Sequence, residues 1–143
     1  MAAINPYLNF MGNTEEAFDF YRSVFGGEFV IFQRFKDIPG AERMPEEDQE
    51  KVMHVSLPIG QGSILMGTDA LASMGHTLTA GNNFYISISA QSEAEAETLF
   101  HGLAAGGQVT VPLDKAFWGS YFGMFIDKFG IQWMINYDYG QQL

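Results

Sequence analysis

Residues Phe117–Asp138, FWGSYFGMFIDKFGIQWMINYD, carry the pattern that decides the fold. They predict two strands joined at Asp127–Gly130, a short turn with Gly130 where the backbone requires a positive φ. After the turn, side chains alternate with a period of two and form an apolar and a mixed set: Ile131, Trp133 and Ile135 against Gln132, Met134 and Asn136. The apolar set is expected to face a core, and the mixed set faces the other way.

Two amphipathic helices are predicted from their caps and apolar stripes. Asn13 with Glu16, and Ser92 with Glu95, have the spacing of capping boxes, and a Gly-Gly pair ends each helix. The strands expected around the helices are 5–10, 29–35, 52–59 and 63–67 in the first half, and 84–89, 108–111, 118–127 and 131–137 in the second. Each half therefore has the order βαβββ.

The two halves also share residues at corresponding places. Three residues of the first hairpin have counterparts in the closing hairpin: Gly62, Leu65 and Met66 against Gly130, Trp133 and Met134. We therefore predict an α+β fold of one domain, 1–143, built from two βαβββ modules, 1–70 and 83–143, with a linker at 71–82. Curved mixed sheets with their helices outside form a concave inner face that suits a small ligand.

The composition is that of a globular protein that avoids anionic partners. Of the 143 residues, 47% are hydrophobic and 17% are charged, and the formal net charge of −10 opposes binding to nucleic acid and anionic membranes. Much of the acid lies in 42–50, which is expected to be a solvated loop. The 13 Phe and 16 Gly suit bulky side chains around a cavity, and they also suit an ordinary aromatic core.

The absence of cysteine excludes disulfides, thiolate nucleophiles and Cys-ligated zinc or iron–sulfur sites. The opening residues, MAAINPYLNF, lack the basic and apolar regions of a signal peptide, and no apolar run reaches the ~18 residues of a membrane span. A soluble cytoplasmic protein is therefore expected.

Several stretches resemble the vicinal oxygen chelate superfamily, which includes glyoxalase I, extradiol dioxygenases, and fosfomycin and bleomycin resistance proteins. These stretches are TEEAFDFYRSVFGG at 14–27 and DKFGIQWMIN at 127–136, and the βαβββ duplication agrees with them. The opening NPYLNFMGNTEEAFDFY and the ending FWGSYFGMFIDKFGIQWMIN are similar to the PhnB-like branch. The resemblance runs from end to end and implies the glyoxalase/bleomycin resistance-type fold and a homodimer.

The superfamily holds its metal at four positions, which the resemblance puts at Asn5, Met66, Tyr85 and Met134. Metal-binding relatives have His or Glu there, and thioether and amide groups are poor ligands for divalent metals that activate oxygen. The resemblance therefore implies no metal at the usual site and no other cofactor, and a divalent metal elsewhere stays an alternative.

Chains of this branch are often labelled ubiquinone-pathway methyltransferases. The motifs here do not support that chemistry, because the glycines lie in hairpins and helix ends and not in the strand-to-helix turn of a nucleotide cofactor site.

His54 is the candidate acid or base among three histidines. It lies in the predicted strand 52–59, in phase with Ser56, so an inward-facing phase gives the site a group that titrates near neutrality. A hydrogen-bonded structural histidine is the alternative. His76 lies in the linker and His101 late in the second helix, and neither suggests a ligand. Tyr85 is the second catalytic candidate.

The inner face predicted from strand phase carries amides, hydroxyls, phenols and thioethers, with no charged side chain. Such a lining suits a neutral, flat or aromatic ligand, with Trp118 and Tyr121 stacking at its edge. Packing of the same side chains against one another is the alternative. The predicted ligand-binding residues are Asn5, Tyr7, Asn9, Ser56, Met66, Ser87, Trp118, Tyr121, Met134 and Asn136.

Three functions follow as hypotheses. The first is a small-molecule-binding protein that has lost the metal site of its superfamily. The second is an enzyme, lyase-like, dioxygenase-like or other, that uses His54 without a metal or holds a metal at another place. The third is a structural dimer with a packed interior. No nucleic-acid or membrane partner is expected.

Overall fold

The structure, a computed structural model, describes residues 2–142 and has two compact units that divide between Thr79 and Ala80. Residues 1 and 143, the outer ends of the two predicted modules, lie outside the described residues. Among the residues described, no helix is long and apolar enough to cross a membrane.

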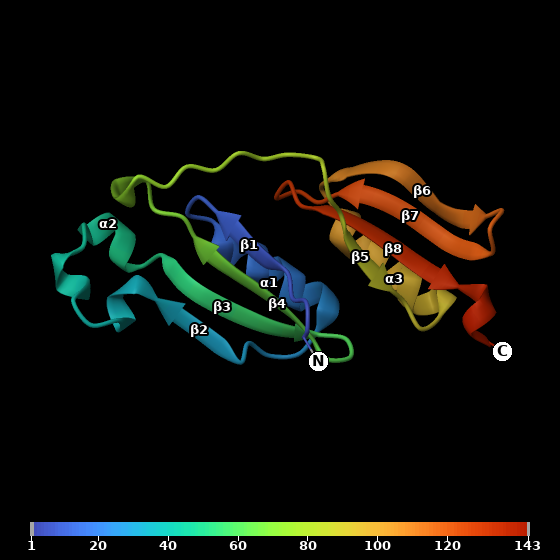
Figure 1. Ribbon diagram of the computed structural model, residues 1–143, viewed down its shortest axis with the longest axis horizontal. Helices are drawn as coiled ribbons and strands as arrows, with labels where there is room; N and C mark the ends of the chain where they lie inside the picture. The colour runs from blue at the N-terminus through green and yellow to red at the C-terminus, as the bar shows by residue number, and fades with distance from the viewer. Residues whose placement is uncertain (1, 143) are drawn as a thin grey trace. The chain divides into compact units, whose positions relative to one another are not determined.

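The first unit contains one four-stranded sheet with helix α1 (Thr14–Phe25) against one of its faces (Figure 1). Its strands, in the spatial order β1-β4-β3-β2, are β1 (Tyr7–Phe10), β4 (Ser63–Asp69), β3 (Val52–Ile59) and β2 (Ile31–Arg34). β1 runs parallel to β4, and the other neighbours are antiparallel. Short helical segments follow β2 and β4: Phe35–Asp37, Ala41–Arg43, α2 (Glu46–Gln49) and Ala72–Met74.

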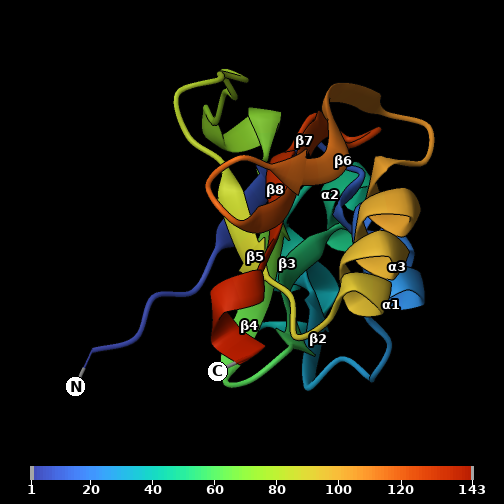
Figure 2. The ribbon, with the colours of Figure 1, turned by 90° about the vertical axis from the view of Figure 1, so that its right-hand side faces the viewer.

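The second unit repeats this arrangement, with α3 (Glu93–Ala104) beside one face of its sheet (Figure 2). Its strands, in the spatial order β5-β8-β7-β6, are β5 (Ile86–Ser89), β8 (Gln132–Asp138), β7 (Ser120–Ile126) and β6 (Gln108–Ala116), and a helical turn, Tyr139–Gln142, follows β8. β5 and β8 form the parallel pair. Both sheets thus have the strand order first, fourth, third, second, and the predicted α+β fold of two βαβββ modules is confirmed.

In each unit, a glycine on the sheet lets the helix of that unit pack closely against the sheet. A Cβ at Gly67 on β4 would lie 2.5 Å from the ring of Phe18 on α1, and a Cβ at Gly123 on β7 would lie 2.5 Å from the ring of Phe100 on α3. The helix-facing strand residues are buried, among them Val55. Because neighbours along a strand alternate between faces, the remaining strand residues lie on the face that the unit's own helix does not cover, which we call the open face.

Asp69, at the end of β4, caps α1 in place of the predicted capping box. The Asn13 side chain makes no capping hydrogen bond, so the prediction for Asn13 is wrong. Instead, Asp69 Oδ1 accepts from the amides of Gly12 and Thr14 at 3.0 and 3.1 Å and from the Thr14 hydroxyl at 2.6 Å. Its other oxygen accepts from the Val52 amide at 2.8 Å. A buried carboxylate therefore joins α1 to the start of β3.

The second helix follows its predicted cap, because Ser92 Oγ accepts from the Glu95 amide at 3.0 Å. Two other expectations change. The strand predicted at 108–111 extends to Ala116 as β6. In the acidic loop 42–50, Asp48 is buried rather than solvated, and it accepts hydrogen bonds from Ser73 and Lys51.

Candidate functional site on the open faces

The open face of the first sheet brings together three predicted site residues on neighbouring strands. Tyr7 of β1 is the cross-strand partner of Met66 of β4, which in turn is the partner of Ser56 of β3. Cross-strand partners share a face, so the phenol, the thioether and the hydroxyl lie in one row. Asn9 and Thr68 form the next pair along β1 and β4.

His54 connects the two ends of this row. Its Nδ1 lies 3.2 Å from the Tyr7 hydroxyl, and its Nε2 lies 2.8 Å from Ser56 Oγ. The Tyr7 and His54 rings are tilted at 40°, with centroids 5.6 Å apart. Tyr7 is 46% exposed, whereas Ser56 is 3% exposed. The three residues therefore form a relay from a buried hydroxyl to an accessible phenol, which we call the Tyr7 relay.

Asn5 does not lie in this row. It precedes β1, and its Oδ1 accepts from the Ile64 amide at 3.0 Å. Its side chain therefore holds the N-terminal segment to the beginning of β4.

The open face of the second sheet is richer in apolar surface. Met134 of β8 pairs with Ser87 of β5 and with Met124 of β7, and all three share this face. In the next row, Asn136 pairs with Phe122. Trp118, 56% exposed, packs edge-on against the Phe122 ring, with centroids 5.5 Å apart. Four predicted residues, Ser87, Trp118, Met134 and Asn136, thus lie along one aromatic and thioether surface.

Tyr121 lies on the opposite side of this sheet from Met134. Its hydroxyl donates to Glu97 of α3 at 3.0 Å, and burial together with this hydrogen bond raises the pKa of the Tyr121 phenol. Strand alternation explains the placement, because Tyr121 is the partner of the buried Tyr137 on the helix-facing side. Tyr85 is half-buried immediately before β5, in the second unit, whereas His54 belongs to the first unit.

The residues at the four implied metal positions do not fit a divalent metal. Met66 and Met134 present thioethers, Tyr85 presents a phenol, and the Asn5 amide oxygen already accepts from a strand amide. Divalent metals in proteins are held mainly by carboxylate and water oxygens or by imidazole nitrogens, depending on the metal. Within residues 2–142, no group of three or more His, Asp or Glu side chains is arranged to hold a metal ion.

The open faces also carry residues outside the predicted set, among them Thr68, Phe122 and Met124. Their signal was present in the sequence, because Phe122 and Met124 alternate with Gly123 and Phe125 in the same way that Met134 alternates with its neighbours. The Thr68 hydroxyl donates to the Met53 carbonyl at 2.7 Å and is therefore engaged with β3.

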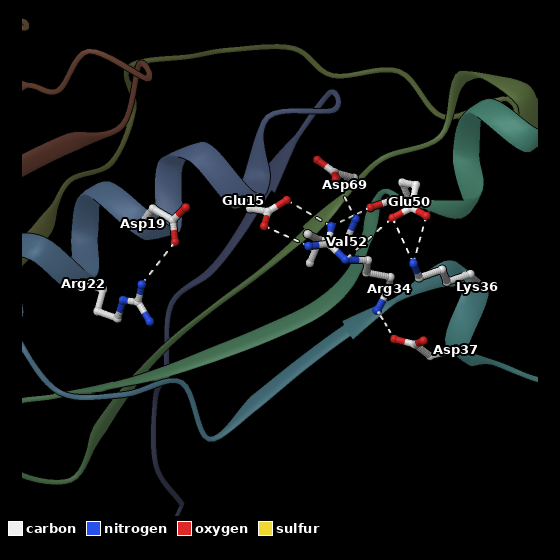
Figure 3. Close-up of polar contacts among 9 residues, drawn as sticks. All are labelled: Glu15, Asp19, Arg22, Arg34, Lys36, Asp37, Glu50, Val52 and Asp69. Carbon is white, nitrogen blue, oxygen red and sulfur yellow. Dashed lines mark hydrogen bonds and ion pairs between the residues drawn. The ribbon is translucent and has the colours of Figure 1, made fainter.

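Charged side chains of the first unit form a separate ion-pair network (Figure 3). The Arg34 guanidinium donates to both Glu15 oxygens, at 3.0 and 2.8 Å, and to the Glu50 carbonyl at 2.8 Å. Lys36 pairs with Glu50 at 2.8 Å. The hydrogen bond from Arg34 is the main cause that lowers the pKa of Glu15. These contacts tie α1 to the segment before β3 and have a structural role.

Comparison with known proteins identifies relatives that share this fold. A family model described as 3-demethylubiquinone-9 3-methyltransferase matches residues 2–136. The chain is 33% identical over 141 residues to Protein YjdN of Escherichia coli strain K12, with 93% of each chain covered. Protein PA1353 from Pseudomonas aeruginosa is 38% identical, with a TM-score of 0.83 over 96% of this chain and 98% of that chain.

The PhnB protein from Bacillus cereus is 28% identical, with a TM-score of 0.74 over 95% of this chain and 99% of that chain. FosX from Listeria monocytogenes, a fosfomycin resistance protein complexed with Mn(II), shares the fold at 12% identity, with a TM-score of 0.62 over 96% of this chain and 93% of that chain. The chain belongs to the family of the matching model, the PhnB-like branch of the vicinal oxygen chelate superfamily, and the resemblance is confirmed.

Proposed function

We propose that this protein binds a small, uncharged molecule with an aromatic or weakly polar surface on the open faces of its sheets, without using a metal. The observation that carries the proposal is the Tyr7 relay beside Met66. A partly exposed phenol, an imidazole and a hydroxyl supply hydrogen-bonding groups, and the row contains no carboxylate, ammonium or guanidinium. Orienting polar groups beside apolar contact surface are typical of small-molecule sites.

The open face of the second sheet supports the same class of ligand. Trp118 and Phe122 present aromatic surface, and Met124 and Met134 present polarizable thioethers, which adapt to flat ligands. The three of these residues that lie in strands are only partly buried within the chain: Phe122, Met124 and Met134. These side chains therefore offer apolar contact area to a ligand.

The methyltransferase of the family description is not our proposal for this chain. A nucleotide-type cofactor commonly uses the free amides at a helix N-terminus. At α1, the Gly12 and Thr14 amides already bind Asp69, and at α3, the Glu95 amide binds Ser92. One first-turn amide of each helix, that of Thr14 in α1 and that of Glu95 in α3, thus already has an internal acceptor.

Acid–base catalysis by the same site is the second candidate. The observation that favours it is that both ring nitrogens of His54 lie within hydrogen-bonding distance of a hydroxyl, which gives a path for a proton from Ser56 to Tyr7. No step through a metal is proposed, since the donor set at the implied positions does not fit one.

A thermal-shift screen with uncharged aromatic compounds in the presence of EDTA tests the proposal. A ligand at a hundred times its Kd stabilises the folded state by about 2.7 kcal/mol, which raises Tm by about 5–10 °C for a chain of this size. The shift should fall in Met66→Ala and persist in the control Met74→Ala, because Met74 is an exposed residue of the linker.

The other hypotheses give different results in this screen. If stabilisation requires added Mn²⁺, Ni²⁺ or Zn²⁺ and EDTA removes it, the metal-free binding protein is wrong and a metal enzyme is favoured. If neither compounds nor metals shift Tm, the packed-interior hypothesis replaces both.

A homodimer and a cytoplasmic location complete the proposal. The apolar side chains of Val109 and Val111 are exposed on the edge strand β6, which suits pairing with a second copy. Light scattering coupled to size-exclusion chromatography should give twice the 15.9 kDa mass of the chain, and a monomer at all concentrations would contradict this part.

A further inference from the structure

The burial of Ser56 bears on the direction in which hydrogen bonds are donated along the Tyr7 relay. The Ser56 side chain is 3% exposed. Within residues 2–142, its Oγ has one hydrogen-bond partner, His54 Nε2 at 2.8 Å. The proton of a hydroxyl that is shielded from water needs a hydrogen-bond acceptor, and His54 Nε2 is the partner in place to accept it. His54 Nε2 is therefore an acceptor.

The tautomer of His54 follows from this acceptor role. A neutral imidazole carries one proton, so a ring with an acceptor Nε2 carries its proton on Nδ1. Nδ1 lies 3.2 Å from the Tyr7 hydroxyl, and in this tautomer it donates to the phenol oxygen. The opposite tautomer, or a protonated ring, would place an N–H against Ser56 Oγ and leave the buried serine proton without an acceptor.

The phenolic proton of Tyr7 is consequently not used inside the relay. Tyr7 is 46% exposed, so its O–H is available to an external group. A phenol oxygen that accepts an N–H bond also donates more strongly through its own proton, because hydrogen bonds in a chain polarise one another. The relay thus presents one reinforced donor on the open face.

We propose that Tyr7 donates this proton to an acceptor oxygen of the bound molecule, which makes the ligand a flat or aromatic compound with a carbonyl-type oxygen. The proposal rests on the proposed function above, since it names the chemistry of the molecule bound there. Met66, the cross-strand neighbour of both Tyr7 and Ser56, supplies the apolar contact for the ring that carries the oxygen.

Two probes that differ only in this oxygen test the proposal. 1-Indanone and indane have the same ring system, and the methyl group of Met66, labelled with carbon-13 and assigned from the Met66→Leu spectrum, reports binding beside Tyr7 by NMR. Indanone should bind about three- to tenfold more tightly than indane, the ratio that one net hydrogen bond provides. In Tyr7→Phe the two affinities should become equal within about twofold.

The direction of donation has its own measurement. The nitrogen-15 shifts of the His54 ring should show a proton on Nδ1 in the wild type. In Ser56→Ala, the ring loses the donor that selects this tautomer, so Nε2 should gain proton occupancy and the preference for indanone should fall. Ser63→Ala is the matched control, because Ser63 is an exposed residue of the same unit, and it should change neither reading.

The outcomes separate the two proposals. Equal affinities of indane and indanone for the wild type, with both shifting Met66, would leave the binding function standing and overturn the carbonyl-type ligand. A His54 ring protonated on Nε2 in the wild type would overturn the direction of the relay. If neither these probes nor any compound of the thermal-shift panel shifts Met66, the proposed function itself is wrong.

Discussion

Asp69→Asn should destabilise the protein strongly, although the two side chains have nearly the same size. The buried carboxylate of Asp69 accepts three hydrogen bonds at Oδ1, from Gly12 and Thr14, and one at Oδ2, from the Val52 amide. An asparagine has one acceptor oxygen and one amino group. If the oxygen takes the place of Oδ1, the amino group faces the Val52 amide, and two donors oppose each other.

The expected magnitude follows from these four bonds. A buried amide without an acceptor costs about 1–3 kcal/mol, and bonds to a charged acceptor, worth about 1.5–3 kcal/mol, become neutral bonds of about 0.5–1.5 kcal/mol. The weaker cap of α1 is not an additional cost, because its hydrogen bonds are among the four already counted. We expect a loss of about 3–5 kcal/mol, which lowers Tm by about 6–20 °C for this chain length.

Thermal unfolding followed by circular dichroism measures the loss, and hydrogen exchange locates it. The Gly12, Thr14 and Val52 amides should exchange faster in Asp69→Asn than in the wild type. Asp19→Asn is the control, because Asp19 is an exposed residue of α1 with one ion pair to Arg22 at 3.6 Å, and such pairs contribute little. An Asp69→Asn variant within about 1 kcal/mol of Asp19→Asn would refute the reasoning.

Two further changes test the packing and the buried loop carboxylate. Gly67→Ala should lower the unfolding free energy by about 1–3 kcal/mol, because its Cβ would lie 2.5 Å from the buried Phe18 ring. Differential scanning calorimetry measures this loss, and Gly81→Ala in the linker is the control that should leave the stability unchanged. Equal effects of the two substitutions would contradict the close contact. Hydrogen bonds from Ser73 and then Lys51 lower the pKa of Asp48, so its carboxylate stabilises the fold above the unfolded-state pKa of about 3.9, and this contribution is lost as pH falls below that value. The Tm difference between wild type and Asp48→Asn should therefore narrow as pH decreases from about 5 to 2, and a constant difference would contradict the assignment.

The fold was predictable because its signals are local. Strand 52–59 was predicted with the observed bounds, Gly130 has the expected positive φ of 89°, and Ser92 caps its helix three residues away. Period-two alternation also placed Ser56, Met66 and Met134 on the faces away from the helices. Each of these inferences needs only neighbours along the chain.

The features that were missed depend on partners far along the chain. The Asn13 prediction failed because Asp69, 55 residues from Thr14, supplies the acceptor. Tyr121 was expected to stack beside Trp118 at the edge of the ligand site, whereas its hydroxyl donates to Glu97 of α3, on the helix-facing side of the sheet. The contact of His54 with Tyr7 joins residues 47 positions apart, and no local pattern indicates it.

The long-range cap of α1 also bears on the order in which the two helices become stable during refolding. α3 receives its cap from Ser92 within its own first turn, whereas α1 waits for Asp69 at the end of the last strand of its unit. Loop closure must precede the second event, and short helices without caps are marginal in water. Pulsed hydrogen-exchange labelling should therefore find amides of α3 protected before those of α1, although α1 comes first along the chain; protection in the reverse order would contradict this. The helix that comes first along the chain is thus the one whose stability depends on the completion of its sheet.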